Sequence, residues 1–263
     1  MAFQILLAEH FISFQHQLTI DIEKAIHEII QTDLTTHSFT FYTSVAVISS
    51  SRIEGEPMEI DSYVKHKIQN IEYLPELVQK PNDLFEAYLF AQDKKLTETN
   101  FLAAHALLST HLLPEKWRGK IRHGEMLVLE HNTGRIQYEA APSYIVAKEF
   151  EKLWHDIDLI INQNMTIEEV FYYASFIHAA FVNIHPFNDG NGRAARLLEK
   201  WFLAEKLGQN AWYIQSEKYY YANINDYYKN LARIGMFYDQ VDYSKMDLFL
   251  QMLPKTLITN KTL

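Results

Sequence analysis

The chain has 263 residues, 48% hydrophobic and 22% charged, and its formal net charge is −9. This composition is typical of a folded domain with a sizeable core and excludes a disordered chain, while the acidic balance argues against a broad nucleic-acid surface, which needs clustered Lys and Arg. Because the chain has no cysteine, disulfides, a thiol nucleophile and a Cys-type zinc site are also excluded.

The first half of the chain predicts helices. Only 8 Gly and 7 Pro leave long segments without a breaker, and the hydrophobic spacing is helical. The expected helices cover residues 5–30 (one or two helices), 39–54, 60–74, 82–91 and 97–108. Gly55, with Pro57 beyond it, is a typical helix stop, and we interpret Pro75 and Pro81 as breaks between neighbouring helices.

The only clear strand pattern lies in residues 117–142. A first hydrophobic run and residues 135–138 flank Asn132-Thr133-Gly134, a sequence typical of a hairpin turn. The first run consists of Met126, Leu127, Val128 and Leu129.

Helices are expected again in the second half, over residues 144–161, from Thr166 onward, 192–207, 223–234 and 245–253. Thr166 and Glu169 form a capping box, and the helix after them is so apolar that it must be nearly wholly buried. Gly208 marks the end of the helix over 192–207.

Residues 185–196, His-Pro-Phe-Asn-Asp-Gly-Asn-Gly-Arg-Ala-Ala-Arg, join a histidine to the start of a helix through a turn rich in Asn, Asp and Gly. Histidine can act as a base near neutral pH. Amide N–H groups at a helix N-terminus bind anions, and two arginines three residues apart share one helix face. Together these features predict chemistry on a phosphate.

This pattern, His-x-Phe-x-Asp-Gly-Asn-Gly-Arg-x-x-Arg, resembles the signature of the Fic family, whose active members transfer AMP from ATP to protein hydroxyl groups. The resemblance implies a mostly α, Fic-type helical fold with a short β-hairpin called the flap. It divides the chain into an N-terminal helical region (1–84), a core (85–240) with the flap over about 122–142, and a helical tail (241–263).

The resemblance also implies roles for the motif residues. His185 would be the general base that takes the proton from a target Ser, Thr or Tyr hydroxyl, and Asp189 would hold Mg²⁺ on the phosphates of ATP. The backbone N–H groups of Gly190, Asn191 and Gly192 would bind the phosphates. Phe187 would tuck the loop into the core.

Residues outside the loop complete the expected ATP site. Arg193 and Arg196 would pair with the β- and γ-phosphates, and Tyr227 and Tyr228 match a Tyr pair that lies near the nucleotide base in the family. The flap run 126–129 would align the target protein, chiefly by backbone pairing.

Ser50-Ser51-Arg52-Ile53-Glu54-Gly55 resembles a second Fic element, Ser/Thr-x-x-x-Glu-Gly/Asn, on an inhibitory helix that we expect over about residues 40–55. The resemblance implies that Glu54 pairs with Arg196 and turns ATP away from its productive position. In some relatives the same glutamate helps water to remove AMP from a modified protein, so Glu54 is interpreted as a brake, a hydrolytic residue or both.

The leading hypothesis is therefore a protein adenylyltransferase that uses ATP and Mg²⁺ and is autoinhibited by Glu54. The alternatives are a hydrolase that removes AMP and a nucleotide-sensing module without turnover. Relatives that transfer phosphate carry lysine at the second motif glycine, and the intact Gly192 argues against that branch. The histidines contain no His-Glu-x-x-His, which sets metalloprotease chemistry aside.

The expected partners are ATP and a protein target, which includes the chain itself. We expect no nucleic-acid partner, no DNA-binding module after the core and no membrane contact. Since no apolar run approaches a membrane span and the first basic residue is Lys24, a cytoplasmic location is expected. Homo-oligomerisation and the identity of the target stay open.

Overall fold

The computed structural model describes residues 3–30, 36–129, 134 and 136–259. Six helices come first: α1 (Phe11–His16), α2 (Ile22–Ile30), α3 (Thr36–Ile53), α4 (Ile60–Gln69), α5 (Pro75–Asp93) and α6 (Glu98–Leu108). A two-stranded antiparallel sheet of β1 (Leu127–Leu129) and β2 (Ile136–Glu139) follows. The remaining helices are α7 (Val146–Ile161), α8 (Ile167–Ile184), α9 (Asn191–Leu207), α10 (Ser216–Ala222), α11 (Ile224–Ala232), α12 (Asp247–Leu250) and α13 (Met252–Thr259). The expected fold, mostly helical with a short hairpin, is confirmed.

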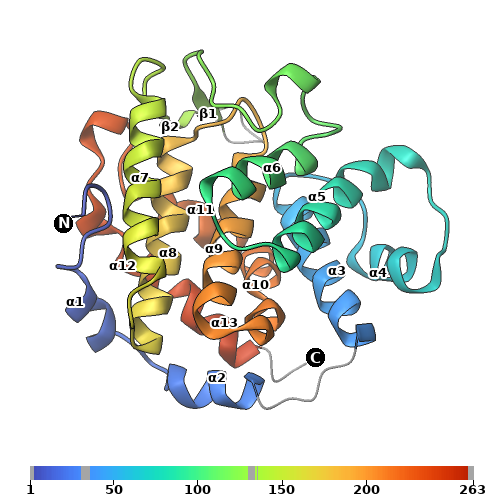
Figure 1. Ribbon diagram of the computed structural model, residues 1–263, viewed down its shortest axis with the longest axis horizontal. Coiled ribbons are helices and arrows are strands. Elements are labelled where there is room, and N and C mark those ends of the chain that lie inside the picture. The colour runs from blue at the N-terminus through green and yellow to red at the C-terminus, as the bar shows by residue number, and fades with distance from the viewer. Residues whose placement is uncertain (1–2, 31–35, 130–133, 135, 260–263) are drawn as a thin grey trace.

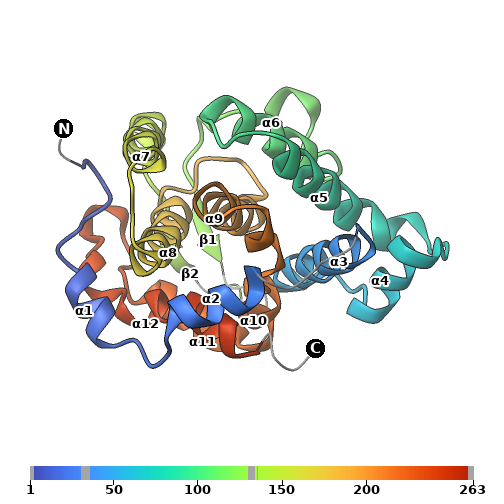
Figure 2. The ribbon, with the colours of Figure 1, turned by 60° about the horizontal axis from the view of Figure 1, so that its bottom comes forward.

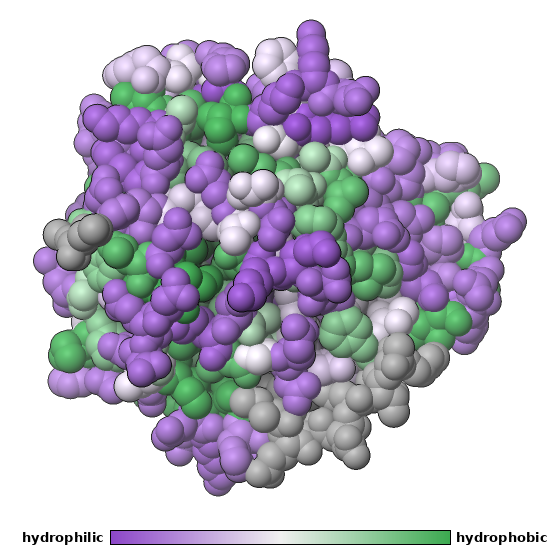
Figure 3. All heavy atoms as spheres, viewed as in Figure 1, coloured by the Kyte–Doolittle hydropathy of each residue, from purple (hydrophilic) through white to green (hydrophobic). Residues whose placement is uncertain are grey.

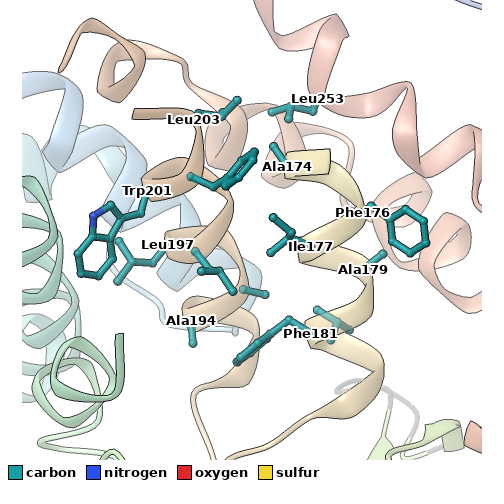
Figure 4. Close-up of a cluster of buried hydrophobic side chains, with 14 of the residues drawn as sticks. Ala174, Phe176, Ile177, Ala179, Phe181, Ala194, Leu197, Trp201, Leu203 and Leu253 are labelled. Carbon is teal, nitrogen blue, oxygen red and sulfur yellow. The ribbon is translucent and has the colours of Figure 1, made fainter. Parts of the chain in front are cut away.

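Helices α8 and α9 form the centre of the molecule (Figure 1). The apolar α8 is buried from Val170 to Ile184, because it is covered by helices on several sides. Figure 4 shows Ile177 and Phe181 pointing from α8 towards α9, whereas Trp201 of α9 points to the opposite side. A helix pair that is buried on both sides gives the turn between them, residues 185–190, a rigid support.

The N-terminal helices share this core. Helices α3, α5 and α6 pack beside α9 (Figures 1 and 2), and buried hydrophobic residues from Ile5 to Leu257 belong to one cluster. The start of the chain is fixed by Asp156 of α7, whose buried carboxylate accepts the backbone N–H groups of Gln4, Ile5 and Leu6 at 2.7–3.0 Å. The segment that ends in Glu54 is thus packed on the helices that carry the motif.

The break expected at Pro81 is wrong, because α5 runs through this residue from Pro75 to Asp93. Pro75 occupies the first turn, where a missing N–H costs nothing. Pro81 is buried in the helix interior, and the packing of α5 against α3 and α6 offsets the hydrogen bond that proline cannot donate.

Two helix boundaries also differ from expectation. The helix expected over 60–74 ends at Gln69, since Asn70 adopts a left-handed conformation (φ 55°), which asparagine tolerates. The segment 245–253 is divided between α12 and α13, whereas the segment 5–30 forms two helices, which is within the expectation of one or two. Helix α10 lies in a stretch for which no element was expected, and Asn132, Thr133 and Arg135 of the hairpin lie outside the described residues.

Within the described part of the chain, no helix combines the length and apolar character needed to cross a membrane. The face in Figure 3 mixes hydrophilic residues with small groups of hydrophobic ones.

Candidate functional site

A cavity of about 400 Å³ lies where the end of α3, the hairpin, α11 and the α8–α9 turn meet. Figure 1 shows the hairpin at the same end of the molecule as this turn. The cavity brings together Glu54, Val128, Leu129, His185, Gly192, Arg196, Tyr227 and Tyr228. The other candidate residues, Met126, Leu127, Asp189, Gly190, Asn191 and Arg193, lie around it without lining it.

His185 ends α8 in a left-handed conformation (φ 51°), which turns its ring into the cavity. Its Nδ1 lies 3.2 Å from the carbonyl oxygen of Val182 and 3.1 Å from the hydroxyl of Tyr138. Because a carbonyl can only accept, Nδ1 carries the hydrogen, and Nε2 keeps a lone pair. Burial lowers the pKa of His185 to about 4, so the ring is neutral at pH 7 and able to accept a proton.

Hydrogen bonds from side chains fix the conformation of the turn after His185. The side-chain amide of Asn191 accepts the N–H of Phe187 at 2.9 Å and donates to its carbonyl at 2.8 Å. The Phe187 ring is fully buried, as expected, and stacks on His105 of α6 with 3.5 Å between ring centroids. His105 Nδ1 accepts the N–H of Gly119, so Nε2 donates to the carbonyl of Asp189.

Helix α9 begins at this turn without a side-chain cap. Its N-cap, Gly190, adopts a left-handed conformation (φ 78°) that favours glycine. The N–H of Gly190 donates to the Asp189 carboxylate at 2.6 Å, so an anion at this amide must displace that contact. At Gly192 a Cβ would lie 2.3 Å from Glu54 Oε1, so a larger residue there would displace the Glu54 side chain.

Arg196 is 1% exposed and is held mainly by the segment that ends α3. Its Nη2 donates to Glu54 Oε1 at 2.6 Å, and its Nε donates to the Ser50 hydroxyl at 2.8 Å. Burial alone would raise the pKa of the Glu54 carboxyl, but Arg196 and Arg193 outweigh it and lower this pKa. Glu54 is thus an ionised group beside the amide N-terminus of α9.

Arg193 also pairs with a glutamate, one that the sequence did not suggest. Its Nη2 donates to Glu56 Oε1 at 3.0 Å, and Lys80 of α5 donates to the same oxygen at 3.0 Å. Glu56 is 9% exposed and follows Gly55, whose φ of 84° turns the chain back. Each motif arginine therefore pairs with one glutamate from the same short segment.

The two tyrosines of α11 lie on the far wall of the cavity. The hydroxyl of Tyr227 accepts a hydrogen bond from Arg196 Nη1 at 3.2 Å, and that of Tyr228 donates to the carbonyl of Ile53 at 3.1 Å. Burial raises the pKa of Tyr227 to about 12, so the hydroxyl keeps its hydrogen. The rings of the two residues meet edge to face.

Among the described residues no further strand pairs with β1, which leaves one backbone edge of the hairpin open there. The N–H of Ala140 donates to Met126, whereas that of Glu139 points the other way and donates to Met236 at 2.7 Å. Since antiparallel strands alternate in this way, Leu127, which lies opposite Glu139, directs its own N–H and C=O away from β2.

A buried arginine joins the base of the hairpin to the end of α8. Arg122 donates to the carbonyl of His185 at 2.7 Å and to the carbonyls of Gly124 and Ala141. No carboxylate among the described residues pairs with it, and such carbonyl-only binding at a helix C-terminus is favourable for a cation. Sequence reasoning missed Arg122, His105 and Glu56, because nothing in their neighbourhood along the chain indicates which groups they meet.

A cation would have one carboxylate at this site. Within the described ranges no three His, Asp or Glu side chains are grouped to bind a metal. Asp189 is exposed at the start of α9, and Mg²⁺ commonly takes one or two carboxylates together with phosphate oxygens. The donor set therefore fits Mg²⁺ only when a phosphate ligand completes it.

Comparison with known proteins agrees with this geometry. Residues 95–203 match the model of the Fic/DOC family, whereas no curated protein sequence matches the chain. Similar folds occur in a Fic family protein from Desulfovibrio desulfuricans G20 (22% identity, TM-score 0.75, covering 98% of this chain and 76% of that one) and a Fic domain containing signaling protein from Bacteroides thetaiotaomicron VPI-5482 (17%, 0.67, 92% and 94%). Residues 134–508 of Fic-1 from C. elegans are a third example (14%, 0.64, 97% and 72%). The matched segment includes the whole 185–196 motif, so this part of the chain is similar to the Fic/DOC family, and the fold of the chain is that of solved Fic-family structures.

Proposed function

We propose that this protein is an adenylyltransferase that transfers AMP from ATP to a Ser, Thr or Tyr hydroxyl of a protein and that Glu54 holds it inactive. The observation that carries the proposal is the meeting of Glu54, His185, Gly192 and Arg196 in one cavity. A base, an uncapped helix N-terminus and a buried arginine are the groups that phosphoryl chemistry requires.

In the proposed reaction, His185 Nε2 takes the proton of the target hydroxyl while its oxygen bonds to the α-phosphorus of ATP. The bond from that phosphorus to the β-phosphate oxygen breaks, and pyrophosphate leaves. The N–H groups of Gly190, Asn191 and Gly192 stabilise the charge on the transferred phosphate. Mg²⁺, held by Asp189 and phosphate oxygens, would offset further negative charge when bound.

The remaining contacts bind and align the two substrates. Arg193 and Arg196 pair with the β- and γ-phosphates, and the rings of Tyr227 and Tyr228 lie where the nucleoside end of ATP would extend. The open edge of β1 receives an extended segment of the target by backbone pairing. Val128 and Leu129, which line the cavity, then face the residue to be modified.

Inhibition follows from competition for Arg196. Glu54 Oε1 accepts a hydrogen bond from the Arg196 guanidinium at 2.6 Å. The same carboxylate occupies the space through which a phosphate would approach Gly192. A partly buried, charge-assisted pair is strong, yet ATP brings a larger negative charge. The resting protein therefore binds ATP weakly or in an unproductive position.

The test is an incorporation assay with Mg²⁺ and ATP labelled at the α-phosphate. We expect Glu54→Gly to label protein at least about tenfold more than wild type. Without the Glu54–Arg196 pair, the free energy of productive ATP binding becomes more favourable by at least about 1.4 kcal/mol. The variant Glu54→Gly with His185→Ala is the matched control and should lose the labelling. If Glu54→Gly binds ATP but labels nothing, the chain is a nucleotide-sensing module or a hydrolase instead.

A second candidate function, removal of AMP from a modified protein, has one observation in its favour. The ionised Glu54 lies in the same cavity as His185, where a carboxylate can orient a water molecule. Release of AMP from a pre-labelled protein by wild type, lost in Glu54→Gly, would support this function. An unchanged rate in Glu54→Gly would exclude Glu54 from it.

A further inference from the structure

A chain of buried polar side chains runs from Arg196 into the core between α8, α9 and α11. Arg196 Nη1 donates to the Tyr227 hydroxyl at 3.2 Å, which lies 2.9 Å from His178 Nε2. His178 Nδ1 lies 2.7 Å from Glu199 Oε2. All four side chains are at most 2% exposed, so water does not compete for these contacts.

The hydrogens of this chain can be arranged so that every contact has one donor and one acceptor. A carboxylate only accepts, so His178 Nδ1 donates to Glu199, and a guanidinium only donates, so the Tyr227 oxygen accepts from Arg196. The Tyr227 hydrogen then goes to His178 Nε2. Each donor in this series of hydrogen bonds therefore points towards Glu199. The negative charge of Glu199 polarises the hydrogen bonds as far as the Arg196 guanidinium.

Among the described residues, neither Lys nor Arg forms an ion pair with Glu199, and its contact with a titratable nitrogen is to His178. Its Oε2 also accepts the Tyr220 hydroxyl at 2.8 Å, and Oε1 has no hydrogen-bond partner in the described part of the chain. A buried carboxylate supported only by neutral donors is costly. Along these hydrogen bonds, the nearest arginine or lysine that could offset the charge of Glu199 is Arg196, three contacts away.

The partners of Arg196 fall into two groups. Glu54 and Ser50 belong to the segment that ends α3. Tyr227 belongs to α11 and is fixed by the buried His178. After loss of the Glu54 side chain, Tyr227 is therefore the hydrogen-bond partner from outside α3 that, beside Ser50, keeps the guanidinium in place.

We infer that His178 and Glu199 are positioning residues that act through the Tyr227 hydroxyl to hold Arg196 ready for the terminal phosphates of ATP. This inference rests on the proposed function, since it assigns Arg196 to the β- or γ-phosphate. The contribution is specific to polyphosphate: AMP, which has no β- or γ-phosphate, does not use Arg196.

The experiment measures the Kd of ATP and of AMP by calorimetry, in a Glu54→Gly, His185→Ala parent that binds nucleotide without consuming it. Tyr227→Phe removes one hydroxyl and keeps the ring, and Glu199→Gln removes the charge and keeps an acceptor. We expect the Kd of ATP to rise about tenfold in the first and about threefold in the second. The Kd of AMP should stay within about twofold of the parent.

Tyr88→Phe is the matched control. Tyr88 is another fully buried tyrosine that donates to a buried glutamate, Glu217, at 2.6 Å, and it makes no hydrogen bond to Arg196. We expect this variant to leave the ratio of the two Kd values unchanged. Circular dichroism and thermal melting establish that each variant is folded, and Tyr227→Phe alone decides the matter if Glu199→Gln does not fold.

The inference is overturned if Tyr227→Phe or a folded Glu199→Gln binds ATP as tightly as the parent, or if ATP and AMP lose affinity equally. Failure of the proposed function gives a different result: if the parent does not bind ATP, both proposals fall, whereas ATP binding without protein labelling by Glu54→Gly overturns the transfer reaction and leaves this inference standing.

Discussion

At the scale of single residues, the site is governed by two glutamates on either side of Gly55. The left-handed turn at Gly55 lets Glu54 reach Arg196 and Glu56 reach Arg193 from one short segment. The proposed brake therefore occupies both motif arginines. Removing Glu54 alone leaves Arg193 paired with Glu56.

We predict that Glu54→Gly with Glu56→Gln binds ATP about threefold to tenfold more tightly than Glu54→Gly alone. The amide has no charge to repel a phosphate or to retain Arg193, and a hydrogen bond to a charged group is worth about 1.5 kcal/mol or more. Calorimetric titration with ATP measures the difference.

Glu59→Gln is the control for this measurement. Glu59 pairs with Arg52 at the surface, so its loss removes one negative charge nearby without touching the motif. Weaker ATP binding after Glu56→Gln would instead mean that Glu56 holds Arg193 in its productive position.

At the scale of elements, helix α8 carries His185 at its end and depends on the cap at its start. The Thr166 hydroxyl accepts the N–H of Glu169 at 3.2 Å, and the Glu169 carboxylate accepts the N–H of Thr166 at 2.7 Å. We predict that Thr166→Ala lowers the free energy of unfolding by about 1 kcal/mol, measured by urea denaturation.

The matched variant Glu169→Gln keeps an acceptor for the same N–H and should cost less than about 0.5 kcal/mol. Equal losses in the two variants would show that the charge at the start of α8, rather than the threonine cap, stabilises it. The Pro81 result belongs to this scale as well: packing against α3 and α6 sustains a helix that its own sequence would interrupt.

At the scale of the whole molecule, acid should destabilise the fold through its neutral buried histidines. Burial lowers the pKa of His105 to about 4 from its ordinary value of 6.5. Between these values the unfolded chain binds more protons than the folded one, so the free energy of unfolding falls as the pH falls. The stabilisation is fully present above about pH 6.5.

For the fully buried His105 this effect amounts to about 2 kcal/mol between pH 7.5 and pH 5.0, and the partly exposed His185 adds to it. Urea denaturation at the two pH values should therefore show a smaller change in His105→Gln than in wild type, even though the variant is less stable at pH 7.5. His123→Gln, at an exposed position, should change as wild type does. Identical changes in His105→Gln and wild type would contradict this account.

The sequence by itself determined the local parts of the protein. The turn from His185 into α9, the cap at Thr166, the hairpin pattern and most helices depend on residues within a few positions of one another, so their spacing predicts them. Family resemblance added the pairing of Glu54 with Arg196, which no local pattern contains because the two lie 142 positions apart.

Only the tertiary structure decided the remaining contacts. Glu56 on Arg193, His105 beneath the motif turn, Arg122 at the end of α8 and the chain from Arg196 to Glu199 all join segments that come together when apolar helix faces are buried. Hydrophobic burial is non-directional, so the sequence specifies which faces are buried, whereas the packing of whole helices fixes which polar groups meet.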